Sequence, residues 1–292
     1  MPREMEPSMR DERRPDWLRR SIGSDASLFG LRRTLRRSGL ATVCESASCP
    51  NRGECWSRGF LTVMILGDVC TRACRFCGVS RGSPAAPDLD EPARVAALLV
   101  GLKLRYVVLT SVDRDDLDDG GAGHWAATIE AVKAACPSVM VEALIPDFEG
   151  SREALRTVLA SRPDVLAHNV ETVASLQSAV RPQADYRRSL SVLVDAAADG
   201  FATKSGFMVG LGETIGEVRQ TLRDLVDAGV SMVTVGQYLQ PARDRLPVSR
   251  YWAPAEFEEI RTAGVALGLE MQAGPFVRSS YRADAAVNGT AA

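Results

Sequence analysis

Lysine is scarce in this chain. Of the 35 lysine and arginine residues, only Lys103, Lys133 and Lys204 are lysines. We interpret this imbalance as genome composition, because arginine and lysine differ in chemistry only at bidentate, stacked or buried sites. The 37 acidic residues leave a formal net charge of −2. So small a net charge gives no electrostatic bias toward nucleic acid or a membrane, and we expect neither as a partner.

Long apolar runs are absent as well. No apolar stretch reaches the length of a membrane-spanning helix, which needs about 18 residues. The N-terminal segment lacks the apolar core of a signal peptide and contains too many acids for a transit peptide. We therefore expect a cytoplasmic protein. A length of 292 residues allows one large domain with extensions, or two small domains.

Cysteine is present and clustered. Six of the seven cysteines fall within 34 residues, at Cys44, Cys49, Cys55, Cys70, Cys74 and Cys77. A chain without an export signal keeps its thiols reduced, which argues against a disulfide framework. Such dense clustering indicates a metal site. The remaining Cys136 lies between an amphipathic segment and Pro137, and we expect a small buried thiol without function.

Apolar runs alternate with amphipathic segments from residue 61 onward. Candidate strands are 61–66, 106–110, 139–145, 165–169, 204–210 and 232–239. Candidate helices are 91–103, 122–135, 151–161, 171–180, 185–199, 214–228 and 254–268, with Thr214 and Glu217 as a capping box. Upstream, a short helix around 27–37 precedes an expected loop over 41–60. Six strand-helix units imply a parallel sheet, either doubly wound or closing toward a barrel, with its active edge at the carboxyl ends of the strands.

Residues 70–77 read CTRACRFC, a C-x3-C-x2-C spacing. Three thiolates on one tight loop can bind three irons of a [4Fe-4S] cube and leave the fourth iron open for chemistry. The alternative is a zinc knuckle or buried thiols, but zinc generally requires a fourth protein ligand. Upstream, Cys44, Cys49 and Cys55 follow a rarer C-x4-C-x5-C spacing, for which a second cluster and a structural or mixed zinc site both remain open.

Three stretches together resemble the lipoyl synthase family of radical S-adenosylmethionine (SAM) enzymes. They are CESASCPNRGECW at 44–56, CTRACRFC at 70–77 and RSSY at 278–281. The resemblance covers roughly residues 16–284. It implies an α/β fold, a partial (β/α)6 TIM-type barrel over 61–268, with an N-terminal extension over 1–60 and a C-terminal segment over 269–292. It also implies two [4Fe-4S] clusters and SAM as cofactors.

The resemblance assigns roles to the two triads. It implies that Cys70, Cys74 and Cys77 hold the cluster that cleaves SAM to a 5′-deoxyadenosyl radical. It implies that the first triad and Ser279, with Ser280 as the second choice, hold an auxiliary cluster. The sulfides of that cluster are then inserted at C6 and C8 of a protein-bound octanoyl group. The resemblance further implies that Asn169 and Glu171 hold the nucleoside and that Arg181 binds the SAM carboxylate.

Other polar residues near strand ends have weaker signals. Five aspartates lie within 113–119, either as an active-site loop or as a solvated loop before a helix, because they do not follow calcium-loop spacing. His168 is expected to be a hydrogen-bonded structural residue. Lys204 either faces the cofactor or simply flanks a strand.

Partners follow from the resemblance, which implies octanoylated lipoyl carrier domains and an external electron donor such as a ferredoxin or flavodoxin. The N-terminal 37 residues contain ten arginines and six acids. We expect this arm to help dock an acidic carrier domain, with a solvated tail as the alternative. Two other functions stay open: another radical sulfur-inserting or methylthio-transferring enzyme, and a non-catalytic iron-sulfur or zinc protein.

Overall fold

The structure is a computed structural model that describes residues 15–18, 26–47, 49–57, 60–102 and 104–280. Most of the arginine-rich N-terminal arm, and with it the predicted docking role, lies outside these residues. Within them, no helix is long and apolar enough to cross a membrane.

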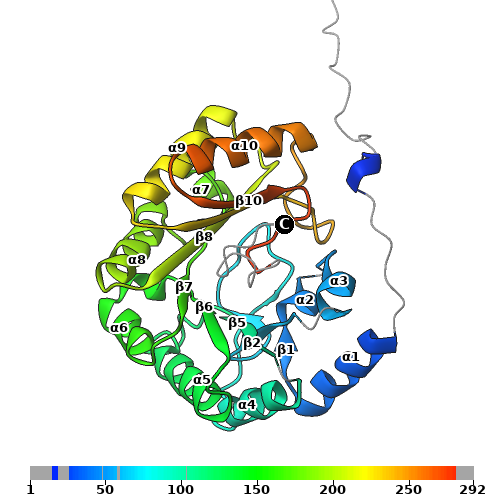
Figure 1. Cartoon of the computed structure of the whole chain (residues 1–292), viewed down its shortest axis with the longest axis vertical. Coiled ribbons are helices and arrows are strands. Elements are labelled where there is room, and N and C mark those ends of the chain that lie inside the picture. The colour runs from blue at the N-terminus through cyan, green and yellow to red at the C-terminus, as the bar shows by residue number, and fades with distance from the viewer. Residues whose placement is uncertain (1–14, 19–25, 48, 58–59, 103, 281–292) are drawn as a thin grey trace, which may run out of the picture.

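An eight-stranded sheet forms the centre of the molecule and curves into an open barrel surrounded by helices (Figure 1). Its strands in spatial order are β1 (Ala41–Thr42), β2 (Thr62–Ile65), β5 (Tyr106–Ser111), β6 (Met140–Leu144), β7 (Val165–Ala167), β8 (Ala202–Val209), β9 (Met232–Gln237) and β10 (Glu270–Gly274). Only β1 pairs antiparallel to its neighbour, and the other pairings are parallel. All six predicted strands are confirmed, and the barrel alternative is the correct one.

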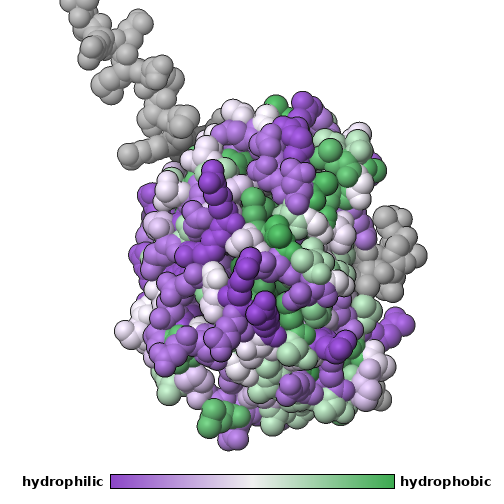
Figure 2. Space-filling model, turned by 90° about the vertical axis from the view of Figure 1, so that its left-hand side faces the viewer, coloured by the Kyte–Doolittle hydropathy of each residue, from purple (hydrophilic) through white to green (hydrophobic). Residues whose placement is uncertain are grey.

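Helices cover the outside of the sheet. They are α4 (Glu91–Leu102), α5 (Ala122–Ala135), α6 (Arg152–Ala160), η3 (Ala174–Leu176), α7 (Gln177–Val180), α8 (Tyr186–Ala198), α9 (Ile215–Asp227) and α10 (Pro254–Ala266). Local sequence starts several of them, because Ser151 and Asp185 cap α6 and α8, and Thr214 forms the predicted capping box with Glu217 at α9. On the face of α6 and α8, polar side chains predominate with apolar ones scattered among them (Figure 2).

Alternation along the strands separates the apolar core from the barrel interior. In β2, Val63 and Ile65 pack in the core beneath the helices, whereas Thr62 and Met64 line the interior, where Met64 also contacts other core residues. In β9, Val233 and Val235 belong to the core, whereas Thr234 and Gly236 face inward. Successive side chains of a strand point to opposite faces, so each strand contributes to both environments.

Two sequence predictions need correction. The segment 41–60, expected to be a loop, contains β1 and two short helices, α2 (Val43–Ser46) and α3 (Arg52–Ser57). These helices are too short to show a clear apolar period, and Thr42 starts α2 by accepting a hydrogen bond from the Glu45 amide. The sequence also missed β10, which extends the sheet by pairing parallel to β9. The remaining described elements are η1 (Asp16–Leu18), α1 (Ala26–Ser38), β3 (Val69–Cys70), β4 (Ser80–Arg81) and η2 (Phe148–Gly150).

Candidate active site

A cavity of about 480 Å³ opens where the parallel strands end, as expected for the carboxyl edge of such a barrel. Strand ends, the cysteine loop, the N-terminal helices and the C-terminal segment all contribute to its wall. Every residue singled out for a site lines it: Cys44, Cys49, Cys55, Cys70, Cys74, Cys77, Asn169, Glu171, Arg181, Ser279 and Ser280. Residues more than two hundred positions apart therefore share one chamber.

The loop 70–77 is attached to the barrel by its backbone. The amide of Thr71 donates to the Asp113 carbonyl at 3.1 Å, and the amide of Arg75 donates to the Val180 carbonyl at 2.9 Å. The amides of Arg72 and Asp113 also point at the sulfur of Cys70, at 3.4 and 3.3 Å. Amides directed at a sulfur stabilise a thiolate or a cluster ligand.

The thiols of this loop are hard to ionise without a cation. Burial raises the pKa of Cys70 to about 12, and the neighbouring Asp113 carboxylate adds to the rise. Burial likewise raises the pKa of Cys74 to about 11, although the nearby Arg181 guanidinium favours the thiolate. Burial also raises the pKa of Cys77. Such thiols lose their protons when positively charged iron binds the sulfur instead. The three thiols are therefore suitable ligands for a metal cluster.

The upstream triad lies on the short helices that the sequence did not predict and on the connection between them. Cys44 is in α2 and Cys55 is in α3, and the Cys49 amide donates to the Cys44 carbonyl at 3.1 Å. Burial, with Cys49 nearby, raises the pKa of Cys44 to about 11. Three thiols that line one cavity wall within twelve residues again fit a cluster.

The C-terminal segment is attached to this upstream triad. The side-chain amide of Asn51 donates to the Phe276 carbonyl at 2.6 Å, across 225 positions of sequence. In Figure 1 the chain after β10 turns inward, toward the centre of the barrel. This contact brings Ser279 and Ser280 to the chamber that Cys49 and Cys55 line.

A single metal ion needs ligand side chains grouped around it. Among the described residues, no three Cys, His, Asp or Glu side chains are grouped as ligands of one metal ion.

Asn169 and Glu171 follow β7, and Arg181 follows α7. The amide nitrogen of Asn169 donates to Glu171 at 3.1 Å, while the Asn169 amide oxygen is buried and accepts no hydrogen bond within the described residues. Burial raises the pKa of Glu171, which also has a strained φ of 66°. Arg181 donates to the Asn169 carbonyl at 3.2 Å, but its buried Nε has no partner in the described chain. Buried polar groups without partners are costly, so these atoms of the cavity wall are candidates for contact with a ligand.

The aspartates of residues 113–119 differ in their positions and partners. Asp113 lines the cavity, whereas Asp116 pairs with Arg114 and Asp119 accepts hydrogen bonds from the start of α5. In this loop, Asp113 therefore belongs to the cavity wall, whereas Asp116 and Asp119 make structural contacts. Cys136 is only half-buried and packs against the core.

His168 is structural, as expected. It is buried with its Nδ1 2.8 Å from the Ile145 carbonyl, and burial lowers its pKa to about 4. The imidazole is therefore neutral near pH 7.

Lys204 lies inside the barrel but does not line the cavity. Its Nζ donates to both carboxylate oxygens of Glu142, at 3.0 and 2.8 Å, and the Tyr106 hydroxyl donates to the same carboxylate at 2.7 Å. Lys204 therefore neither faces the cavity nor simply flanks a strand, because it forms a buried ion pair with Glu142. The local sequence around either residue does not predict this pair, because the two residues are 62 positions apart.

Sequence reasoning missed three polar residues of this region. Arg245 and Tyr238 line the cavity from the chain after β9, and the Tyr238 hydroxyl donates to the Leu246 carbonyl at 2.7 Å. Arg72 lies between Cys70 and Cys74 and also lines the cavity. Its position inside CTRACRFC was the available signal, since a cation buried in a cysteine loop requires acidic partners.

Comparisons with known proteins give the family that the chain resembles. A family model described as the Radical SAM superfamily matches residues 64–225, more than half of the chain. The chain is 53% identical over 275 residues to "Lipoyl synthase" of Chlorobium chlorochromatii, a match covering 93% of this chain and 94% of that protein. It is 53% identical over 276 residues to "Lipoyl synthase" of Methylococcus capsulatus, covering 93% and 86%.

Solved structures share the fold at low identity. The crystal structure of methylornithine synthase (PylB) gives a TM-score of 0.54 at 16% identity, covering 85% of this chain and 82% of that chain. Streptococcus suis SuiB bound to S-adenosylmethionine gives a TM-score of 0.58 at 8% identity, covering 76% of this chain and 53% of that chain.

Proposed function

The chain belongs to the lipoyl synthase family of the radical SAM superfamily, and from this premise we propose how its two cysteine triads divide the reaction. Members of this family are sulfur-inserting enzymes that use a [4Fe-4S] cluster and SAM. The chain accordingly acts on octanoyl groups of carrier proteins. We propose in addition that it holds a second cluster and that the two clusters face one chamber.

Cys70, Cys74 and Cys77 are proposed to hold the cluster that binds SAM. Three donors on one loop leave one iron open, and the unpartnered atoms of Asn169 and Arg181 lie on the same cavity wall. In this proposal Arg181 binds the SAM carboxylate, and Asn169 with Glu171 binds the ribose hydroxyls. A carboxylate would complete the bidentate geometry that a guanidinium prefers.

Cys44, Cys49, Cys55 and Ser279 are proposed to hold the auxiliary cluster. The contact between Asn51 and Phe276 supports this assignment, because it joins the C-terminal segment to the helices of the triad. A serine oxygen is a harder ligand than a thiolate, so the iron it holds is more readily released. Ready release suits a cluster that is consumed.

With both clusters and SAM bound, the cofactors would supply two 5′-deoxyadenosyl radicals, one from each of two SAM molecules, to take one hydrogen atom from C6 and then one from C8 of the octanoyl chain, and cluster sulfide to form the two new carbon–sulfur bonds. The protein must hold the acyl chain and exclude water. Apolar side chains of the strands line the chamber for this purpose: Met64, Val108, Leu144 and Met208. The observation that carries the proposal is that both triads and Ser279 line a single cavity.

The proposal also assigns the segments of the chain and its partners. We place the auxiliary cysteines in an N-terminal extension over 1–60, the radical barrel over 61–268 and the serine ligand in a C-terminal segment over 269–292. Octanoylated lipoyl carrier domains are the partners, and a ferredoxin or flavodoxin in the cytoplasm supplies electrons.

The test uses full-length protein reconstituted anaerobically with iron and sulfide, an octanoyl-lysine peptide, SAM and a reductant. We expect close to eight irons per chain, negligible zinc, 5′-deoxyadenosine, and a peptide that gains two sulfurs. Cys74→Ala should abolish SAM cleavage. Cys49→Ala should keep SAM cleavage but lose sulfur insertion. A protein that cleaves SAM and leaves the peptide mass unchanged would refute the substrate assignment, and one or two zincs per chain would refute both clusters.

A further inference from the structure

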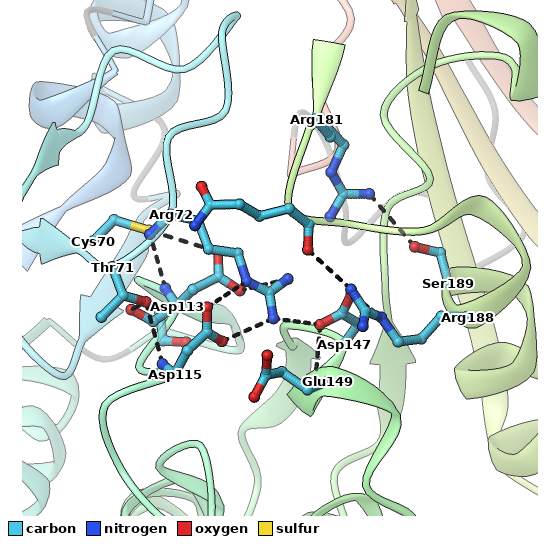
Figure 3. Close-up of polar contacts among 12 residues, drawn as sticks. Cys70, Thr71, Arg72, Asp113, Asp115, Asp147, Glu149, Arg181, Arg188 and Ser189 are labelled. Carbon is cyan, nitrogen blue, oxygen red and sulfur yellow. Dashed lines mark hydrogen bonds and ion pairs between the residues drawn. The ribbon is translucent and has the colours of Figure 1, made fainter. Parts of the chain in front are cut away.

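Arg72 is a buried cation in the middle of the cysteine loop. Its side chain is 1% exposed. Nε and Nη2 donate to the two oxygens of Asp115 at 2.7 and 2.8 Å, a bidentate pair. Nη2 also pairs with Asp147 at 2.7 Å, and Nη1 lies 3.4 Å from Asp113. Figure 3 shows the guanidinium between these three carboxylates.

The three carboxylates come from two different strand ends. Asp113 and Asp115 follow β5, and Asp147 follows β6. Asp147 also accepts a hydrogen bond from Arg188 of α8 at 2.9 Å. Burial alone would raise the pKa of Asp147, but the hydrogen bond and charge of Arg72 outweigh it and hold the pKa at about 2. The loop is thus joined to the rigid part of the barrel through ionised groups.

The same contacts determine the surroundings of one sulfur. The Arg72 and Asp113 amides both point at the sulfur of Cys70, and the Thr71 hydroxyl donates to the Asp113 carbonyl at 3.0 Å. The Asp113 carboxylate lies 3.6 Å from that sulfur. Its negative charge is offset by the Arg72 guanidinium on its other side. Moving the guanidinium would therefore change both the amides and the charge next to Cys70.

We propose that Arg72 is a positioning residue for the SAM-binding cluster. Its bidentate bond to Asp115 and its pair with Asp147 hold Cys70 and Cys74 at the spacing the cluster requires and direct two amides at the Cys70 sulfur. This inference rests on the proposed assignment of Cys70, Cys74 and Cys77 as ligands. Hydrogen bonds and charges near cluster sulfurs affect reduction potential, so the effect reaches beyond folding.

Three substitutions separate the positioning role of Arg72 from its contribution to stability. Arg72→Met leaves three carboxylates facing one another in a buried place and is expected to fold poorly. Arg72→Lys keeps the charge but cannot form the bidentate bond, so the chain folds while the loop loses its geometry. Asp115→Asn weakens the same bond from the other side.

The chain offers a matched control in Arg114. Its side chain is also 1% exposed, and it bonds Asp116 in the same aspartate loop at 2.8 Å. Its other partners are the carbonyls of Leu66 and Ala85, away from the cysteine loop. Arg114→Lys therefore imposes a similar change on a buried arginine without touching the loop of interest.

The experiment measures three quantities on reconstituted full-length protein: the reduction potential of the SAM-responsive cluster by paramagnetic resonance, the dissociation constant of SAM, and the rate of iron loss to a chelator. For Arg72→Lys we expect a shifted potential, SAM binding about 10-fold weaker, and iron loss about 10-fold faster from the SAM-responsive cluster. Asp115→Asn should act in the same direction, and the double variant should show less than the sum of both effects. Arg114→Lys should leave all three quantities unchanged.

The outcomes distinguish this inference from the proposed function. If Arg72→Lys and Asp115→Asn keep the potential and the SAM affinity of the unaltered protein, Arg72 has only a structural role and the inference is wrong. The same holds if Arg114→Lys shifts the potential as much as Arg72→Lys. If the unaltered protein shows no SAM-responsive cluster at all, the ligand assignment itself is wrong.

Discussion

Gly236 of β9 and Val277 of the C-terminal segment are in close contact. A Cβ added at Gly236 would lie 2.1 Å from the carbonyl oxygen of Val277, far inside contact distance. Only glycine lets the segment pass this close to the strand. Since Val277 precedes Ser279 by two positions, the glycine sets where the proposed serine ligand lies.

Gly236→Ala should therefore displace the C-terminal segment while leaving the cysteine loop in place. We expect SAM cleavage to continue and sulfur insertion to fall roughly 100-fold, because a shift of about 1 Å at a reacting centre has effects of that size. Separate assays of 5′-deoxyadenosine and of the lipoyl product measure the two steps. Gly101→Ala in α4 is the control, since its added Cβ meets nothing within 4 Å. Equal loss of both activities would contradict the expectation.

Ser279 and Ser280 can be told apart directly. Ser279→Ala should lower the iron bound at the auxiliary site and abolish sulfur insertion, whereas Ser280→Ala should change neither. Ser279→Cys should retain iron but slow sulfur insertion about 10-fold or more, because a thiolate holds iron more firmly than a serine oxygen does. Iron content and product formation are the measurements. If Ser280→Ala rather than Ser279→Ala loses iron, the ligand is the second serine.

Breaking the buried pair of Lys204 and Glu142 should lower the free energy of unfolding. Lys204→Met leaves the Glu142 charge buried without a cation, which we expect to lower the free energy of unfolding by about 3–5 kcal/mol. Replacing both by apolar residues, as in Lys204→Met with Glu142→Leu, should recover most of the loss. Lys133→Met breaks a partly exposed pair with Asp164 and should cost less than about 1 kcal/mol. Urea unfolding measures the free energy of unfolding of all three variants. Equal decreases for Lys133→Met and Lys204→Met would contradict the expectation that the buried pair is more costly to break.

Titration of His168 should make the stability of the fold depend on pH. Its pKa falls from the ordinary 6.5 to about 4 in the folded protein because of burial. Between these values the unfolded chain binds a proton that the folded chain does not, so stability decreases as pH falls from about 6.5 toward 4. Once the pH is below both values, this loss of stability reaches roughly 3–4 kcal/mol, since each pKa unit corresponds to about 1.4 kcal/mol. His168→Asn keeps a donor for the Ile145 carbonyl and should flatten the dependence over this window, as measured by urea unfolding at several pH values. An unchanged slope would rule out His168 as its source.

Much of the barrel could be predicted because its strands and helices are long enough to show their period. The capping box at Thr214 and the capped starts of α6 and α8 are likewise local features. The short helices α2 and α3 could not be predicted this way, since so few residues give no readable period. Their helical form depends on the neighbours they contact.

Cysteine spacing alone was enough to propose the cluster ligands, because spacing within a loop is a local property of the sequence. Contacts between distant residues depend on the whole fold: Asn51 with Phe276, Lys204 with Glu142, and Arg72 with Asp115 and Asp147. Each of these pairs joins separate elements of the fold. Their distance depends on how the whole sheet curves and how its helices pack, and no short window of sequence contains that information.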